Sequence, residues 1–159
     1  MSMTAEARAL ASPLRLRILR ICLHEPRTNK EIAQTLGMNP GSTLHHVRTL
    51  VNTGFLAAQA PRKGARGARE VPYLATQRSW DTPVPGIGPI LVQTFLDEAA
   101  EVAPDDLGII RLGLKVTQDD AKELLQRLQE LLVEFKDRPS SPDGDAISVF
   151  VAVHPDRSA

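Results

Sequence analysis

The most constraining feature of this sequence is a pair of closely spaced helix boundaries in its first third. Thr28 and Glu31 have the spacing of a capping box, in which hydroxyl and carboxylate satisfy each other's backbone donors. The helix that begins at this capping box is expected to end at Gly37, because glycine readily adopts the left-handed conformation found at helix C-termini. Asn39 and Pro40 then cap and open the next helix. The chain is therefore expected to form two short helices joined by a tight turn.

A further helix precedes this pair. Between Ala5 and His24, apolar residues recur at spacings of three and four, and Ser12 before Pro13 predicts that the main helix starts there. Ala33 is small where the paired helices must approach each other. The side chains expected in their shared core are Ile32, Leu36, Val47 and Leu50.

After residue 54 the apolar pattern changes from helical to strand-like. Short apolar runs flank the basic segment PRKGARGARE, which predicts a β-hairpin with a long tip. Proline and glycine then gather in residues 77–89, as in a linker. We expect a domain over residues 5–76, this linker, and a second region over residues 90–155.

The second region alternates between helical and strand-like patterns. Ile90–Val102 has a broad apolar stripe at helical spacing, and residues 118–137 are predicted to form a strongly amphipathic helix. Apolar and polar residues alternate in residues 107–117, which predicts a strand, and residues 146–153 are predicted to form the last strand. A sheet of two strands covered by one helix leaves apolar surface open, which favours burial against a second copy. The predicted fold class is α+β, mainly α, with a helix-strand-helix-strand dimerisation or accessory region.

The two short helices have helix-turn-helix geometry, which holds the second helix where a major groove about 12 Å wide can admit it. The runs SPLRLRIL, TNKEIAQTLG and STLHHVRTLVNTGFL, with a basic wing ending in PYL, resemble the winged helix-turn-helix of ArsR-type bacterial transcriptional regulators. This resemblance covers a little under half of the chain. It implies a dimeric repressor or activator with residues 40–53 in the major groove and the wing, residues 60–70, on the backbone or in the minor groove.

The charge distribution supports contact with nucleic acid. The whole chain carries 19 basic and 19 acidic residues, a formal net charge of zero. Residues 1–75 nevertheless hold eleven Lys and Arg against four acids, a balance of +7, and the remainder is −7. Asymmetry of this kind indicates that the basic half faces nucleic acid and the acidic half faces away.

The candidate DNA contacts are polar or basic residues on the second short helix and on the wing. Arg suits guanine or phosphate, and a Ser near a helix N-terminus can hold a phosphate. Of two adjacent histidines, His45 is expected to face outward. Sequence leaves the helical phase open, because either Thr43 or Leu44 completes the core stripe. The candidates are Ser42, Thr43, His45, His46, Arg48, Thr49, Arg62, Lys63, Arg66 and Arg69.

Other classes of function find little support. Cys22 lies on an apolar helix face, where an inert thiol is expected, and Gly86 and Gly88 lack the third glycine and preceding strand of a dinucleotide loop. Metal-sensing ArsR-type members carry cysteine pairs or clusters of His, Asp and Glu, whereas Cys22 and His24 stand alone. We therefore expect no enzyme, no cofactor and no metal site.

The expected partners are a palindromic double-stranded operator and a second copy of the chain, which binds through Ile90–Val102 and the C-terminal region. The sequence leaves open whether a small-molecule effector is sensed. The alternative is a winged-helix protein-interaction module that does not bind DNA. A single cysteine, no signal peptide and no apolar run of membrane-spanning length favour the cytoplasm.

Overall fold

The computed structural model describes residues 3–157, and it describes the backbone but not the side chain of Arg66. The chain divides into two compact units, Met1–Ala103 and Pro104–Ala159. The division falls after helix α5 (Gly88–Ala99), whereas the sequence places it in residues 77–89. The later boundary has a physical reason, because α5 packs against α2 (Pro13–Ile21) inside the first unit.

The first unit begins with α1 (Ala5–Leu10) and α2, as two separate helices. The Thr4 side chain caps α1, and the Ser12 side chain caps α2, in which Pro13 holds the first position. The predicted start at Ser12 and Pro13 is confirmed. Leu10 and Ile18, one from each helix, are fully buried.

The predicted pair of short helices is present as α3 (Asn29–Leu36) and α4 (Pro40–Asn52). The Thr28 N–H donates to the Glu31 carboxylate at 2.7 Å, and the Glu31 N–H donates to the Thr28 hydroxyl at 3.2 Å. Gly37 ends α3 with φ +63°, a left-handed conformation that glycine adopts without strain. Local capping chemistry thus sets the helix-turn-helix.

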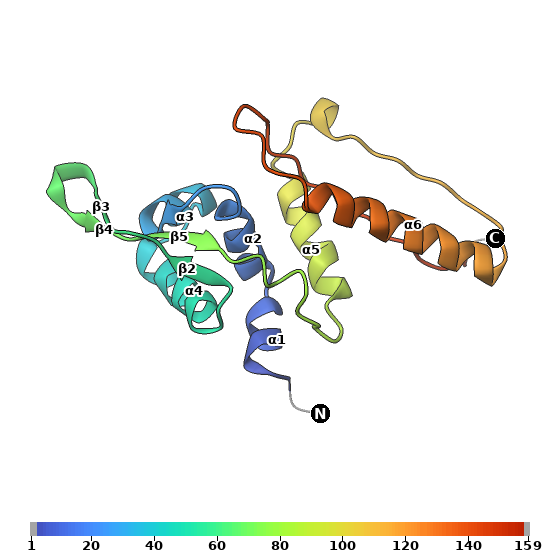
Figure 1. Ribbon diagram of the computed structural model, residues 1–159, viewed down its shortest axis with the longest axis horizontal. Coiled ribbons are helices and arrows are strands. Elements are labelled where there is room, and N and C mark those ends of the chain that lie inside the picture. The colour runs from blue at the N-terminus through green and yellow to red at the C-terminus, as the bar shows by residue number, and fades with distance from the viewer. Residues whose placement is uncertain (1–2, 158–159) are drawn as a thin grey trace. The chain divides into compact units, whose positions relative to one another are not determined.

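A small sheet and a hairpin form the wing. The three-stranded antiparallel sheet has the order β1-β5-β2, and the separate pair β3–β4 carries the tip (Figure 1). The turn η1 (Ala65–Gly67) joins β3 to β4. The strands are β1 (Arg27–Thr28), β2 (Leu56–Ala58), β3 (Arg62–Lys63), β4 (Arg69–Glu70) and β5 (Pro72–Ala75). The predicted hairpin with a long tip is confirmed. The two-residue strand β1 was not predicted from the sequence.

One core holds these elements together. It draws on α1, α2, α3, α4 and β2, and Tyr73 and Ala75 of β5 pack against its edge. Its buried members are Ala9, Leu10, Ile18, Leu19, Cys22, Ile32, Val47, Leu50, Phe55 and Leu56. Burial of this kind is worth about 1.5–3 kcal/mol for each large apolar side chain.

Helix α5 packs on α2 through a polar face. Thr94 is buried, and its hydroxyl donates to the Ile90 carbonyl at 2.8 Å. Arg20 of α2 lies 3.3 Å from the carboxylate of Glu98. Arg17 of α2 likewise pairs with Glu101, just beyond the end of α5. Four large apolar residues on α5 and shortly after it are exposed: Leu91, Val92, Leu96 and Val102.

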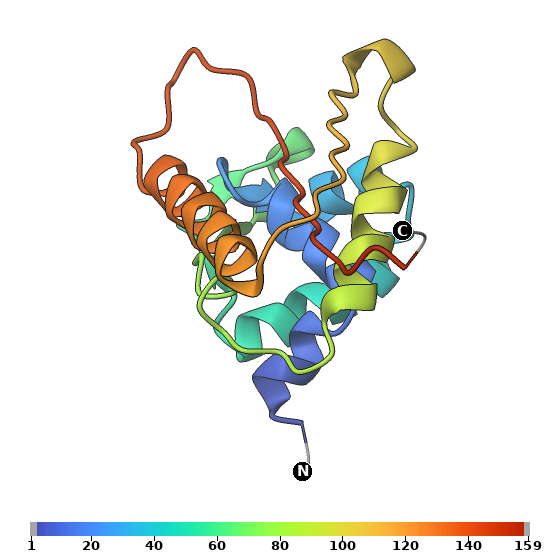
Figure 2. The ribbon, with the colours of Figure 1, turned by 90° about the vertical axis from the view of Figure 1, so that its right-hand side faces the viewer.

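The second unit contains η2 (Pro104–Asp106) and the long helix α6 (Gln118–Lys136). Thr117 and Asp120 form the capping box of α6. The prediction of strands over residues 107–117 and 146–153 is wrong, since the described residues of both segments are extended but pair with no strand (Figures 1 and 2). Alternation shows which side chains share a face, but a strand also needs a neighbour with which to form hydrogen bonds.

The apolar stripe of α6 does not form a closed core within the described second unit. Leu131 and Phe135 are half exposed, and Ile110 and Ile147 of the extended segments are almost fully exposed. The expectation that this stripe packs as ordinary core on two strands is therefore corrected. The exposed apolar side chains of this unit are therefore available for contact with another protein surface.

Candidate nucleic-acid interface

Helix α4 has one buried face, which fixes its rotation about its own axis. Thr43, Val47 and Leu50 are each 0% exposed, and Leu44 is only half-buried. The sequence leaves open whether Thr43 or Leu44 completes the buried stripe of α4, and the structure shows that it is Thr43. The helix starts where the Asn39 side chain accepts a hydrogen bond from the Gly41 N–H at 2.8 Å.

The burial of Thr43 corrects its place among the candidate DNA contacts. Its hydroxyl donates to the Asn39 carbonyl at 3.0 Å, inside the domain. A residue with no exposed surface cannot reach a base or a phosphate. Thr43 supports the start of α4 from within.

The opposite face of α4 is polar and exposed. Ser42, His45 and Arg48 are exposed, and Thr49 is half-buried with its hydroxyl donating to the His45 carbonyl at 3.0 Å. The expectation that His45 points outward is confirmed. These side chains recur at spacings of three and four, so they share one side of the helix.

His46 lies between the two faces. Its ring meets the ring of His45 edge-on with centroids 5.5 Å apart, and among the described residues its buried Nδ1 has no hydrogen-bond partner. Burial lowers the pKa of His46, and the nearby positive charges of Arg15 and His45 lower it further. Both effects favour the neutral form of His46.

The tip of the wing brings two cations face to face. In the β3–β4 ladder, Lys63 lies directly opposite Arg69, and both are exposed. Like charges at opposite positions of a ladder destabilise it. The Gly64 N–H donates to the Ala68 carbonyl at 2.7 Å and closes the turn. An anion at the tip would relieve the repulsion between the two cations.

Arg62, another wing candidate, is engaged within the chain. Its Nη2 lies 2.6 Å from the Glu31 carboxylate, so that an ion pair joins the wing to α3. The pKa of Glu31 is lowered, first by the hydrogen bond from the Thr28 backbone and also by the charge of Arg62. Sequence reasoning missed this contact because 31 residues separate the partners. The side chain of Arg66, the remaining wing candidate, lies outside the described residues.

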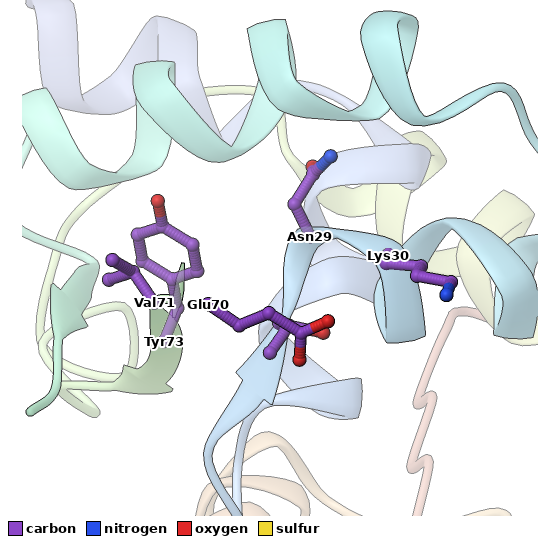
Figure 3. A pocket seen from close by; sticks show the side chains of 6 residues that line it. Asn29, Lys30, Glu70, Val71 and Tyr73 are labelled. Atoms are coloured by element: carbon purple, nitrogen blue, oxygen red, sulfur yellow. The ribbon is translucent and has the colours of Figure 1, made fainter. Parts of the chain in front are cut away.

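A hollow of about 250 Å³ lies between the start of α3 and the wing strands (Figure 3). Its lining includes Lys30, Glu70 and Tyr73. The Asn29 amide donates to the Pro40 carbonyl at 2.8 Å, and among described residues its buried Oδ1 has no partner. The hollow carries both a cation and a carboxylate, so its charge favours neither sign of ligand.

Cys22, the one cysteine of the chain, lies in the core of the first unit. Burial raises the pKa of Cys22 to about 12, which keeps the thiol protonated and unreactive. Among the described residues, no three His, Cys, Asp or Glu side chains come together as a metal site would require. Over the same part of the chain, no helix combines the length and apolar character needed to cross a membrane.

Comparison with known proteins agrees with this geometry. A family model described as a helix-turn-helix domain matches residues 10–57. The first unit is thus a winged helix-turn-helix domain, the class of DNA-binding domain that transcriptional regulators use. The prediction of this fold is confirmed. A search of curated proteins finds no match.

Several solved structures are similar over most of their own length. A homodimeric winged helix-turn-helix DNA-binding domain from Mycobacterium bovis, described as a possible ArsR-family transcriptional regulator, is 26% identical, with 61% of this chain and 80% of that chain covered and a TM-score of 0.39. Another fragment from that organism, described as a possible transcriptional regulatory protein, is 22% identical, with 60% and 86% covered and a TM-score of 0.39. Reduced HlyU from Vibrio cholerae is 19% identical, with 60% and 84% covered and a TM-score of 0.37. Because these scores are low, the fold assignment rests on the elements described above.

Proposed function

We propose that this chain is a sequence-specific, double-stranded DNA-binding transcriptional regulator in which α4 enters the major groove. The observation that carries the proposal is the two-faced character of α4. One face is fully buried in the core, and the other presents Ser42, His45 and Arg48 to solvent. A helix held rigidly by its inner face can place polar side chains against base edges without further ordering.

Each exposed residue of α4 has a role that follows from its chemistry. Arg48 can donate two parallel hydrogen bonds to a guanine edge. Ser42 lies in the first turn, where free N–H groups and the helix dipole favour a phosphate. His45 and Thr49 extend the same surface. His46 is half-buried and borders this surface.

The wing supplies contacts that do not depend on base sequence. Lys63 and Arg69 face each other at the tip, and we place Arg66 with them on the DNA backbone or in the minor groove. Each phosphate that the protein neutralises adds about 0.9 to the slope of log affinity against log salt. Arg62 contributes mainly by holding the wing to Glu31.

The regulator acts in the cytoplasm as a homodimer. Helix α5 exposes Val92 and Leu96 on the side away from α2, and Leu91 and Val102 are also exposed. The region over residues 90–155 adds further exposed apolar surface. Two copies related by a twofold axis would bury these faces against each other. They would also present two α4 helices about 34 Å apart to a palindromic operator.

Selection of bound sequences from a random duplex pool tests the proposal. The expected product is a palindrome, and affinity for it should fall steeply as salt rises. Arg48→Gln should weaken binding about 5- to 150-fold, the equivalent of about 1–3 kcal/mol for a guanine contact. Arg127→Gln removes the same charge from an exposed site on α6 and serves as the control.

Two outcomes would contradict the proposal. One is the absence of salt-dependent affinity for any duplex, which would favour a protein-interaction module. The other is an equal loss of affinity in Arg48→Gln and Arg127→Gln, which would mean that α4 does not read bases.

A further inference from the structure

Among the described residues of the first unit, several arginines have carboxylate partners and others have none. Those of α2 that face α5, and Arg62 of the wing, are paired with carboxylates. Arg8 and Arg15 bond only to main-chain carbonyls: Arg8 to Met3, and Arg15 to Arg8 and Ala9. Both guanidinium groups therefore lack an acidic partner among the described residues.

These two arginines line a hollow of about 360 Å³ between α1, the start of α2 and the last turn of α4. Both ribbon views show α1 beside that end of α4 (Figures 1 and 2). The lining carries no acidic side chain. It consists of Ala5, Arg8, Ala9, Arg15, Thr49, Asn52 and Thr53.

Several hydrogen-bond donors of the hollow remain available. Only Nη2 of Arg8, and Nε and Nη2 of Arg15, are used within the described residues, so Nη1 of both guanidinium groups is free. The exposed Asn52 amide has no partner there either. In contrast, the hydroxyls of Thr49 and Thr53 already donate to carbonyls of α4. The free donors thus come from three helices, α1, α2 and α4.

Electrostatics favour an anion in this hollow. The C-terminal ends of α1 and α4 lie nearby, and each contributes about half a negative charge. Two guanidinium charges exceed that sum by about one unit. Arg15 is also half-buried, and burial lowers its pKa, so its charge is partly desolvated without a carboxylate to offset the cost.

We propose that this hollow is an oxyanion-binding site, which takes a phosphate or carboxylate group between Arg8, Arg15 and Asn52. The oxyanion has two possible sources: a free small anion, or a backbone phosphate of bound DNA. Only the second source rests on the proposed function. Because α4 contributes Thr49, Asn52 and Thr53, occupancy bears directly on the helix proposed to read DNA.

The first arm of the test uses the DNA-free protein and inorganic phosphate, followed by amide chemical shifts. Saturable shifts are expected in residues 5–9, 15 and 49–53. Asn52→Asp places a negative charge in the hollow without touching either arginine, and it should abolish those shifts. Gln34→Glu adds the same charge on an exposed site of α3 and should leave them unchanged.

The second arm measures duplex affinity against salt concentration. If a DNA phosphate fills the hollow, Arg8→Gln should lower the salt slope by about 0.9. Thermal unfolding of each variant separates loss of the site from loss of fold, and Arg8→Gln leaves the bonds from Arg15 to α1 in place. The inference is overturned if phosphate produces no saturable shifts and the Arg8→Gln slope equals that of the wild type. Intact duplex binding in that case would leave the proposed function standing.

Discussion

Ser42 and Thr43 are neighbours in sequence with opposite environments. Thr43 is fully buried and bonds to the Asn39 carbonyl, whereas Ser42 is exposed on the outer face of α4. We expect Thr43→Val to lower the free energy of unfolding by about 1 kcal/mol, since it removes one buried hydrogen bond at constant shape. Ser42→Ala should change stability by less than about 0.5 kcal/mol. Urea denaturation of both variants measures the difference, and equal losses would contradict the assigned phase of α4.

His46 makes folding stability depend on pH. Its pKa is lowered in the folded protein, while the unfolded chain has the ordinary value near 6.5. The unfolded state therefore binds more protons at mildly acidic pH, and the stability that comes from neutral His46 is complete above about pH 6.5. That stability is lost as the pH falls through the lower folded pKa. Chemical denaturation between pH 7.5 and 5 should show a steeper loss for the wild type than for His46→Gln. His45→Gln removes only a lesser cause of the lowered pKa of His46, so it should keep the larger part of the dependence, which burial causes.

At the scale of elements, the wing is tied to the helix-turn-helix by the pair Arg62 and Glu31. Lys63, the next residue of β3, has no acidic partner among the described residues. We expect Lys63→Gln to lower the salt slope of duplex binding by about 0.9 and Arg62→Gln to lower it by less. Glu31→Gln keeps a side chain able to cap α3, so it isolates the loss of charge. An equal or larger fall in Arg62→Gln would mean that Arg62 leaves Glu31 for a phosphate when DNA binds.

The elements that local chemistry determines could be predicted from the sequence. The caps at Ser12, Thr28 and Asn39 and the left-handed stop at Gly37 each act within four residues, and all four are present. The rotation of α4 could not be predicted, because Thr43 and Leu44 are both compatible with the spacing of Val47. Only packing against the other helices decides between them.

Features that depend on residues far apart in the sequence were either not predicted from the sequence or predicted wrongly. The polar face of α5 looked like part of one broad apolar stripe, because its partners Arg17 and Arg20 lie more than 70 residues earlier in the chain. The strands expected over residues 107–117 and 146–153 had the right alternation but no neighbour to pair with. For the site, sequence reasoning found the exposed face of α4 and the basic tip, and it missed the contact between Arg62 and Glu31.

At the scale of the whole molecule, the charge asymmetry is partly used inside the first unit. Arg17 and Arg20 are neutralised by Glu101 and Glu98, at the contact between α2 and α5. Among the described residues, the basic side chains without a carboxylate partner include Arg48 on α4, Lys63 and Arg69 at the tip of the wing, and Arg8 and Arg15 at the hollow beside α1. The same ion pairs hold the polar side of α5 inward, which turns its apolar side toward solvent.

The exposed side of α5 should determine whether the protein is a dimer. Leu96 is 53% exposed on that side. A glutamate there would place a charge in the proposed interface, where an unpaired charge is costly. We expect Leu96→Glu to convert the dimer into a monomer at micromolar concentration, as measured by sedimentation velocity.

DNA binding by the same variant distinguishes a lost interface from a lost fold. A folded Leu96→Glu monomer keeps α4 and the wing, so it should retain affinity for a single half-site. It should lose the added affinity for the palindrome, because the second half-site is no longer delivered at high effective concentration. Leu131→Glu, which alters an apolar residue of α6 that is 50% exposed, measures the contribution of the C-terminal region. A monomeric wild type, or a Leu96→Glu variant that stays dimeric while Leu131→Glu does not, would move the interface away from α5.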